Sequence, residues 1–195
     1  MKRTIRAVLV VVVAMLLGSA VSAQRAAARQ GGQAASSIRI GVGAGLLLPI
    51  GDYKTADKLG WLGGADVTYW LTGGMFGIRA EGSYSQTSEA SGVTPHKTKI
   101  FGGMADVVWA PGTSADQIRP YLLAGLGFYN VKIDITGFGS GSETKVGFGG
   151  GAGAAFKVGT GGTRVFVEGK FVSVSTDVTK TNFIPIRAGV RFATK

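Results

Sequence analysis

The residues best suited to chemistry surround the single histidine of the sequence. His96 lies in the segment Val-Thr-Pro-His-Lys at 93–97, and Ser85, Ser88 and Ser91 precede it. A histidine that takes a proton from a serine hydroxyl is a common arrangement for acyl transfer. The spacing here matches no catalytic motif, and a histidine in a polar loop is usually solvated. We therefore expect neither a nucleophilic pair nor a metal site at this segment.

Two carboxylates and a glycine-rich run also invite a chemical interpretation. Glu81 and Glu168 could act as a paired acid and base, as in glycoside hydrolysis. Each has a cation two positions away, Arg79 or Lys170, so ion pairing is the simpler explanation. The run 147–152 fits a loose dinucleotide-binding pattern, but it lies within an alternating segment and no helical pattern follows it. We predict a protein that is not an enzyme and uses no cofactor or metal.

The first residues predict export. Three cations precede an apolar run over 7–17, and the small residues at 21–23 suit a processing peptidase. We expect residues 1–23 to be a cleaved signal peptide, because a retained membrane anchor would need roughly 20 apolar residues. Residues 24–37 have no apolar period and predict a disordered leader.

The charge of the chain limits its partners. The full sequence carries a formal charge of +10, and removal of the signal leaves 18 Lys or Arg against 11 Asp or Glu, which is +7. An exported chain rarely meets nucleic acid, and no basic stripe with interleaved aromatic residues is present. We expect no nucleic-acid partner, and the positive charge suits anionic lipid or polysaccharide.

Apolar and polar residues alternate with a period of two from Ile38 onward, which is typical of β-strands. No apolar stripe of helical period continues for ten residues. The chain is therefore predicted to be all-β. Eight segments are predicted as strands, of which 119–133 is apolar on both faces and leaves its facing open: 38–50, 60–71, 75–87, 98–110, 119–133, 144–158, 164–175 and 182–192.

The side on which the apolar residues of these segments lie distinguishes a membrane barrel from a soluble one. Charged residues lie opposite the apolar set, and segments of about 11 to 13 residues suit a tilted membrane crossing better than a globular sheet. We predict an eight-stranded antiparallel up-and-down transmembrane β-barrel whose apolar face lies in lipid. A soluble lipocalin-like barrel with the opposite facing is the alternative, and it would be extracted without detergent.

The interior of such a barrel is narrow. Eight strands enclose a lumen that side chains fill or that holds one small ligand. We expect Trp70, Tyr121 and Tyr129 to fill it opposite inward glycines, the alternative being a cavity. Unpaired charges inside would be costly, so the interior charged residues are predicted to form one mixed-sign network. Its expected members are Arg79, Glu81, Asp106, Glu168, Lys170 and Arg187.

The connectors between the segments are rich in Gly, Asp, Ser and Thr, as turns are. An even number of antiparallel strands places both termini at one end, and shorter turns usually lie on the periplasmic side. Both termini are therefore expected in the periplasm. The connectors expected outside, where they could meet an extracellular ligand, are 51–59, 88–97, 134–143 and 176–181; those expected inside are 72–74, 111–118 and 159–163.

Four short motifs resemble the small bacterial outer-membrane β-barrel family, whose members include the barrels of outer membrane proteins A, X and W. They are Leu-Pro-Ile-Gly-Asp-Tyr at 48–53, Arg-Ala-Glu-Gly-Ser-Tyr at 79–84, Arg-Pro-Tyr-Leu-Leu-Ala-Gly-Leu-Gly at 119–127 and Phe-Ile-Pro-Ile-Arg-Ala-Gly-Val-Arg-Phe at 183–192. The resemblance covers 38–192. It implies a monomeric integral protein of the outer membrane, in contact with its lipid and inserted by the barrel assembly machinery.

The resemblance leaves the activity open. It fits a structural, envelope-integrity or surface-interaction role with a filled lumen. The alternative is a passage or binding barrel for small or hydrophobic solutes, similar to outer membrane protein W. Some similar barrels acylate or deacylate lipid A, which needs a histidine or carboxylate near a serine, and His96 with its three serines is the candidate set.

The end of the sequence departs from the family pattern. Relatives commonly end on an aromatic residue that the assembly machinery reads, whereas Phe192 is followed by the overhang 193–195. Either Phe192 serves as the signal despite the overhang, or assembly is less efficient. Deletion of 193–195 and measurement of the outer-membrane yield separates the two: an unchanged yield shows that the overhang is harmless.

Overall fold

The computed structural model describes residues 38–195 apart from 93–94, 136, 138, 176–179 and 195. The expected signal peptide, 1–23, and leader, 24–37, lie outside the described residues. Among the described residues no helix is long and apolar enough to cross a membrane. The described residues form eight antiparallel strands: β1 (Ile38–Ile50), β2 (Gly60–Trp70), β3 (Phe76–Ser88), β4 (His96–Trp109), β5 (Ile118–Ile135), β6 (Gly139–Lys157), β7 (Arg164–Ser175) and β8 (Lys180–Ala193).

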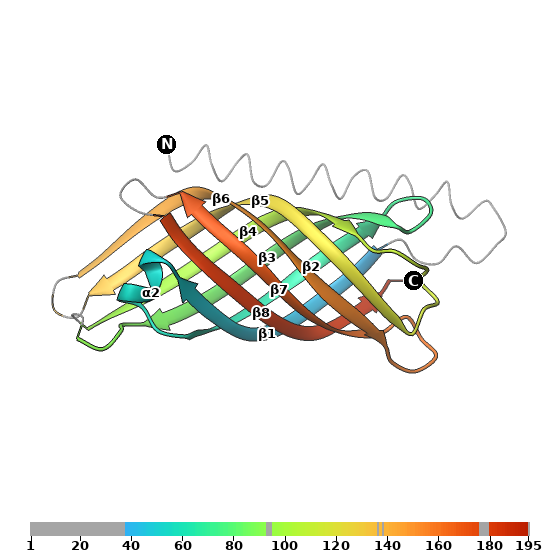
Figure 1. Ribbon diagram of the computed structural model, residues 1–195, viewed down its shortest axis with the longest axis horizontal. Coiled ribbons are helices and arrows are strands. Elements are labelled where there is room, and N and C mark those ends of the chain that lie inside the picture. Colours follow the sequence, from blue (N-terminus) through green and yellow to red (C-terminus); the bar gives the residue numbers. More distant parts are fainter. Residues whose placement is uncertain (1–37, 93–94, 136, 138, 176–179, 195) are drawn as a thin grey trace. The chain divides into compact units, whose positions relative to one another are not determined.

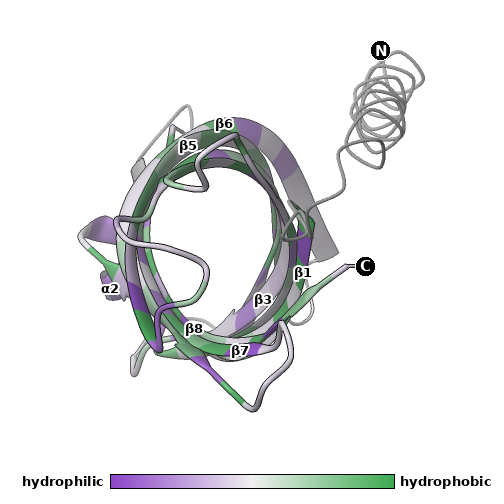
Figure 2. Cartoon of the chain, turned by 90° about the vertical axis from the view of Figure 1, so that its right-hand side faces the viewer, coloured by the Kyte–Doolittle hydropathy of each residue, from purple (hydrophilic) through white to green (hydrophobic). Residues whose placement is uncertain are grey.

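Each strand pairs with its sequence neighbours, and β1 pairs with β8 to close the barrel, as Figures 1 and 2 show. The predicted eight-stranded up-and-down barrel is thus confirmed. The closing seam runs from Arg39 opposite Ala193 to Ile50 opposite Asn182. The backbone N–H of Thr194 extends it by donating to the carbonyl of Ile38 over 3.1 Å.

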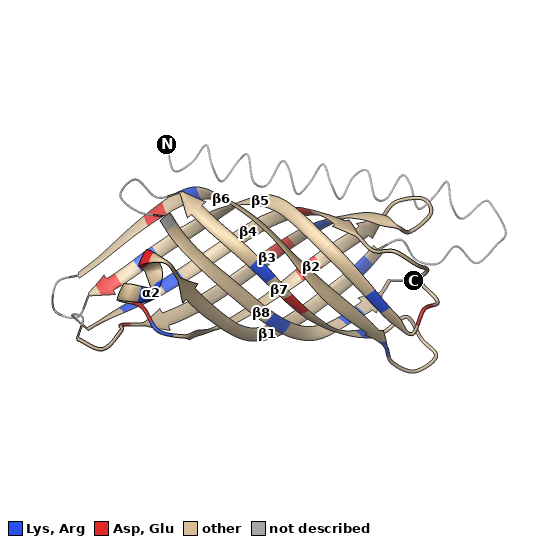
Figure 3. Cartoon of the chain, in the orientation of Figure 1, with Lys and Arg blue, Asp and Glu red and all other residues tan. Residues whose placement is uncertain are grey.

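In the middle of the barrel the outer wall is apolar and the inner wall carries the charges, whereas Lys99 and Lys132 lie on the outer face at the loop end. Figure 3 shows where the charged residues lie along the strands. The predicted facing holds in the other seven strands; for β5, whose two faces are both apolar and whose facing the sequence left open, the structure turns Leu122 and Leu126 outward and Tyr121 inward. Exposed aromatic residues lie near the two ends of the outer wall, as in the girdles of barrels that cross membranes. They include Phe76, Trp109, Phe156 and Phe192 at one end and Trp61, Tyr84, Phe101 and Phe128 at the other.

The two ends of the barrel differ in the connectors that they carry. The turn end carries the start of β1, the end of β8 and the connectors 71–75, 110–117 and 158–163. The loop end carries the connectors 51–59, 89–95, 136–138 and 176–179. The first of these loops contains a short helix, α2 (Asp52–Ala56), which follows Gly51 at a φ of 60°.

The expectation that 134–143 forms a long loop is wrong. β5 and β6 continue as a hairpin until Ile135 pairs with Gly139, across a tight connector in which Gly137 has a φ of 85°. The Gly-Ser-rich stretch at 139–142 contains no apolar alternation, so the sequence pattern concealed a strand. β6 pairs with β5 throughout, and its pairs with the described residues of β7 begin at Gly147. Paired strands, and not a long loop, therefore make up most of the β5–β6 connection at the loop end.

Inward glycines make room for tyrosine rings. A Cβ atom at Gly102 would lie 2.5 Å from the ring of Tyr129, and one at Gly147 would lie 2.8 Å from the same ring. The ring of Tyr129 therefore lies between two glycines and cannot move away from one without meeting the other. Gly153 accommodates Tyr121 in the same way, because a Cβ there would overlap its ring.

Substitution of the adjacent glycines Gly102 and Gly103 tests this packing. We expect Gly102→Ala to destabilise the barrel by about 1–3 kcal/mol, because the added methyl overpacks the Tyr129 site. Gly103→Ala is the matched control, since Gly103 faces outward and its nearest neighbour to an added Cβ is 4.0 Å away. Urea unfolding in lipid vesicles measures both, and equal midpoints for the two variants would contradict the tyrosine packing.

Candidate functional site

The lumen contains three layers of side chains. Near the loop end a cluster of apolar residues is buried, including Leu47, Leu62, Tyr129 and Phe183. Near the turn end a second apolar cluster contains Val108, Leu123 and Phe166 with Tyr121, and Trp70 packs against it. Between the two clusters lies a layer of charged side chains, hereafter the charged layer: Asp66, Arg79, Glu81, Asp106, Glu168, Lys170, Arg187 and Arg191.

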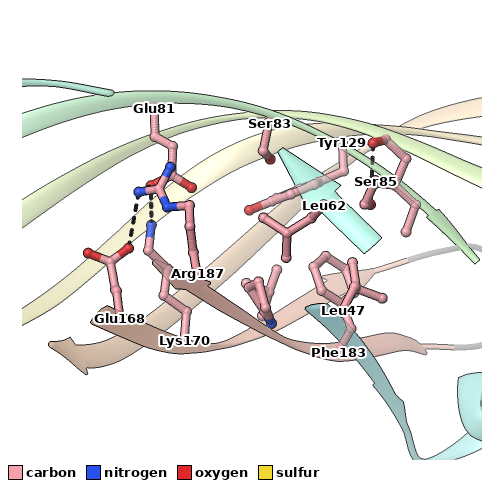
Figure 4. A pocket seen from close by; sticks show the side chains of 13 residues that line it. Leu47, Leu62, Glu81, Ser83, Ser85, Tyr129, Glu168, Lys170, Phe183 and Arg187 are labelled. Carbon is pink, nitrogen blue, oxygen red and sulfur yellow. Dashed lines mark hydrogen bonds and ion pairs between the residues drawn. The ribbon is translucent and has the colours of Figure 1, made fainter. Parts of the chain in front are cut away.

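The structure brings the six expected network residues together. Arg79 Nη1 donates to Glu168 Oε2 over 2.6 Å. Lys170 Nζ lies 2.9 Å from both Glu81 Oε2 and Asp106 Oδ2. Arg187 Nη2 connects the Arg79–Glu168 pair to the group around Lys170, because it contacts Glu81 Oε2 at 2.9 Å and Glu168 Oε1 at 3.2 Å (Figure 4).

Two members of the charged layer were not expected there. Asp66 accepts from Arg187 Nη2 over 3.1 Å and from Arg191 Nε over 3.1 Å. Arg191 also lies 3.2 Å from Glu168 and donates to the hydroxyl oxygen of Tyr121 over 2.9 Å. Alternation in the sequence places both residues inside, but their height in the lumen follows from the stagger between strands. With them the layer contains four cations and four carboxylates, so it is formally neutral.

Strand register explains why these eight residues meet. Glu168 of β7 is opposite Arg187 of β8, and Arg79 of β3 is opposite Asp106 of β4. Asp66 of β2 is likewise opposite Glu81 of β3, and the cations that neutralise them reach across the lumen from β7 and β8. Cross-strand and cross-lumen contacts therefore combine into one network.

The three expected lumen-filling aromatic residues lie in two places. Tyr121, a member of the turn-end cluster, contacts the charged layer: its hydroxyl donates to Glu168 over 2.9 Å, and Arg79 and Arg191 lie beside its ring. Trp70 packs against the same cluster, with the guanidinium of Arg119 4.2 Å from its ring centroid. Tyr129 lies in the loop-end cluster, edge-on to Phe183 with ring centroids 5.8 Å apart. Aromatic rings therefore fill the lumen on both sides of the charged layer.

His96 is not a loop residue, contrary to expectation, because β4 begins there. Its Nε2 lies 3.2 Å from Oδ2 of Asp57, which is buried and also accepts from the hydroxyls of Thr87 and Thr98. Tyr53 of α2 completes this group through Thr87. Burial raises the pKa of the Tyr53 hydroxyl, so the hydroxyl stays protonated. These contacts fasten the 51–59 loop to β3 and β4.

The three serines of the candidate set with His96 have other surroundings. Ser85 faces the lumen and its hydroxyl lies 3.5 Å from the carbonyl of Ile100, whereas Ser88 and Ser91 are exposed. Within the described part of the chain, no group of three or more metal-binding side chains could hold an ion. The acidic and basic groups of the charged layer contact each other, as the pairing of Glu81 and Glu168 with Lys170 and Arg187 illustrates.

Comparisons with known proteins agree with this geometry. The solved structure of Neisserial surface protein A is similar at a TM-score of 0.64 and 17% identity, over 82% of this chain and 98% of that one. The N-terminal barrel domain of Pseudomonas aeruginosa OprF gives 0.51 at 17% identity, over 80% and 95%. A major outer membrane protein of Thermus thermophilus gives 0.52 at 12% identity, over 80% and 98%. No curated protein matches the sequence.

The likeness to these structures establishes the fold, and a family model establishes the membership. The model describes an outer membrane protein β-barrel domain and matches residues 12–192, which include all eight strands up to Phe192. An apolar outer wall with aromatic girdles and a charged interior is what this family requires in the membrane. The chain therefore belongs to the outer membrane protein β-barrel domain family and is an integral protein of the outer membrane.

Proposed function

We propose that the barrel is a closed, non-enzymatic anchor in the outer membrane, with a structural, envelope-integrity or surface-interaction role. The observation that supports this function is the charged layer, which joins β2, β3, β4, β7 and β8 across the lumen. Apolar clusters lie on both sides of it. Such an interior offers no continuous aqueous path, which is consistent with the small diameter of an eight-stranded barrel.

The orientation that suits this role places both termini in the periplasm and the loop end outside. The loop-end connectors, 51–59 above all, together with the β5–β6 hairpin would then meet an extracellular ligand. Phe192 would be the signal that the barrel assembly machinery reads, and its exposed position on the outer wall leaves it accessible during insertion. The barrel would act as a monomer in outer-membrane lipid.

A second candidate function is the binding of a small or hydrophobic solute. A pocket between the loop-end cluster and the charged layer favours it (Figure 4). Its walls include Leu47, Leu62 and Phe183, and Glu81 and Lys170 line its other side. The pocket thus has one apolar and one polar wall, as amphiphile sites often do.

Conductance in a planar bilayer tests the closed lumen. We expect no stepwise ion current from the refolded protein, and none after Trp70, Tyr121 and Tyr129 are all changed to Ala, because the charged layer still spans the lumen. A current from the unaltered protein would contradict the closed anchor and favour solute passage. A current from the variant alone would show that aromatic side chains, and not the charged layer, close the barrel.

The stability of the anchor depends on neutrality within the charged layer. The carboxylate of Asp106 has Lys170 as its ion-pair partner, so Lys170→Met leaves a buried charge uncompensated. We expect a loss of about 3–5 kcal/mol in unfolding free energy, and recovery of at least half of it when Asp106→Asn is added. Urea unfolding in vesicles provides the measurement.

The matched control for this pair is Lys132→Met. Lys132 is exposed and pairs with Asp134 at the loop end, so its loss should cost less than about 1 kcal/mol. Additive losses for Lys170→Met and Asp106→Asn would contradict the coupling and show that each side chain acts alone.

A further inference from the structure

The turn end of the lumen contains three buried cations that the charged layer does not neutralise. Arg39, Arg119 and Arg164 are 8%, 4% and 4% exposed. Among the described residues their side-chain hydrogen bonds go to backbone carbonyls, and none of the three has a carboxylate within ion-pair distance. The acceptors are Gly162 for Arg39, Gly74 and Ala110 for Arg119, and Ala155, Ser114 and Asp116 for Arg164.

Asp116, the nearest acidic residue in these turns, makes its carboxylate hydrogen bonds within its own turn and not with the arginines. The carboxylate of Asp116 accepts from the backbone N–H and the hydroxyl of Thr113, over 2.8 and 2.9 Å. These hydrogen bonds lower the pKa of Asp116, so it stays ionised, but they direct its oxygens toward its own turn. The four carboxylates of the charged layer are already matched by four cations. The three arginines and the carboxylate of Asp116 therefore leave a net charge of +2 among these four described side chains of the turn end.

The three arginines line one pocket together with Trp70 and Tyr121. Two buried donors on its walls, Nε of Arg119 and Nε1 of Trp70, have no hydrogen-bond partner among the described residues. The two side chains are stacked, so these donors belong to one wall. A buried donor without an acceptor is costly, and here every unused group is a donor next to uncompensated positive charge. An acceptor that carries negative charge would satisfy both donors and offset the positive charge of the arginines.

We propose that this turn-end pocket binds a small oxyanion of phosphate type. A tetrahedral oxyanion presents several acceptor oxygens, and planar guanidinium groups donate to such oxygens in pairs. The stacked indole and guanidinium would supply the two unused N–H groups, and Arg39 and Arg164 the remaining charge. The turn carbonyls that already hold the three guanidinium groups fix them in place before the anion enters.

The phosphate group could be free or could belong to a lipid headgroup, and one experiment separates the two sources. The barrel is refolded in a sugar-based detergent and titrated with inorganic phosphate at constant ionic strength, with chloride as the replacement ion. Calorimetry measures binding, and the shift of the thermal unfolding midpoint is a second readout. A parallel sample in vesicles compares phosphatidylglycerol with phosphatidylcholine in phosphate-free buffer.

Three variants test the assignment. Arg119→Lys keeps the charge but removes the Nε donor and the planar fork, and Trp70→Phe removes one N–H while keeping an aromatic ring. We expect each to weaken phosphate binding about tenfold, since a hydrogen bond to a charged group contributes roughly that much. Lys132→Gln removes one exposed charge at the loop end and should leave the affinity unchanged.

The outcomes are distinct. Binding of phosphate that depends on Arg119 and Trp70 supports a site for a free oxyanion. Stabilisation by phosphatidylglycerol alone, lost in the same two variants, assigns the site to a lipid headgroup. No response to either probe, or equal responses in all three variants, would overturn the proposal. The Trp70→Phe variant keeps every turn tether, so a folded variant is available even if Arg119→Lys loosens the turns.

Discussion

Charge neutrality inside a low-dielectric wall is the constraint on which the barrel depends. The charged layer consists of four acids and four bases drawn from β2, β3, β4, β7 and β8. A single uncompensated charge there would cost several kcal/mol, and turning any of these strands over would place that charge in lipid. Facing, register and stagger of the strands are therefore fixed together by one set of ion pairs.

The apolar parts of the lumen follow a second rule, the complementarity of ring and glycine. Tyr129 lies between Gly102 and Gly147, and Tyr121 lies against Gly153. Glycines weaken a strand in general, because they cost entropy and supply no side chain. In this narrow lumen they are what allows large rings to enter, so the high glycine content of the sequence is part of the core packing.

Much of this architecture could be predicted from alternation alone. A period of two assigns each residue to a face, which is why Arg79, Glu81 and Arg187 could be placed inside and Phe192 outside. Height along the barrel depends on stagger, which alternation does not encode, and so Asp66 and Arg191 were not expected in the network. The first part of β6, 139–143, was missed because glycine and serine give no apolar signal, and the contact of His96 because its buried acceptor, Asp57, is distant in sequence.

A closed barrel normally has no sheet edge, but among the described residues the β5–β6 extension has one. Between Gly139 and Val146 the described part of β6 pairs with β5 on one side and has no described strand on the other. Its outward N–H and C=O groups form a short template on which a further strand could add by backbone pairing. The glycines at 139 and 141 and the charged pair of Glu143 with Lys145 are the kind of residues that limit such growth. The composition of this segment thus disfavours edge-to-edge pairing with a second copy of the chain.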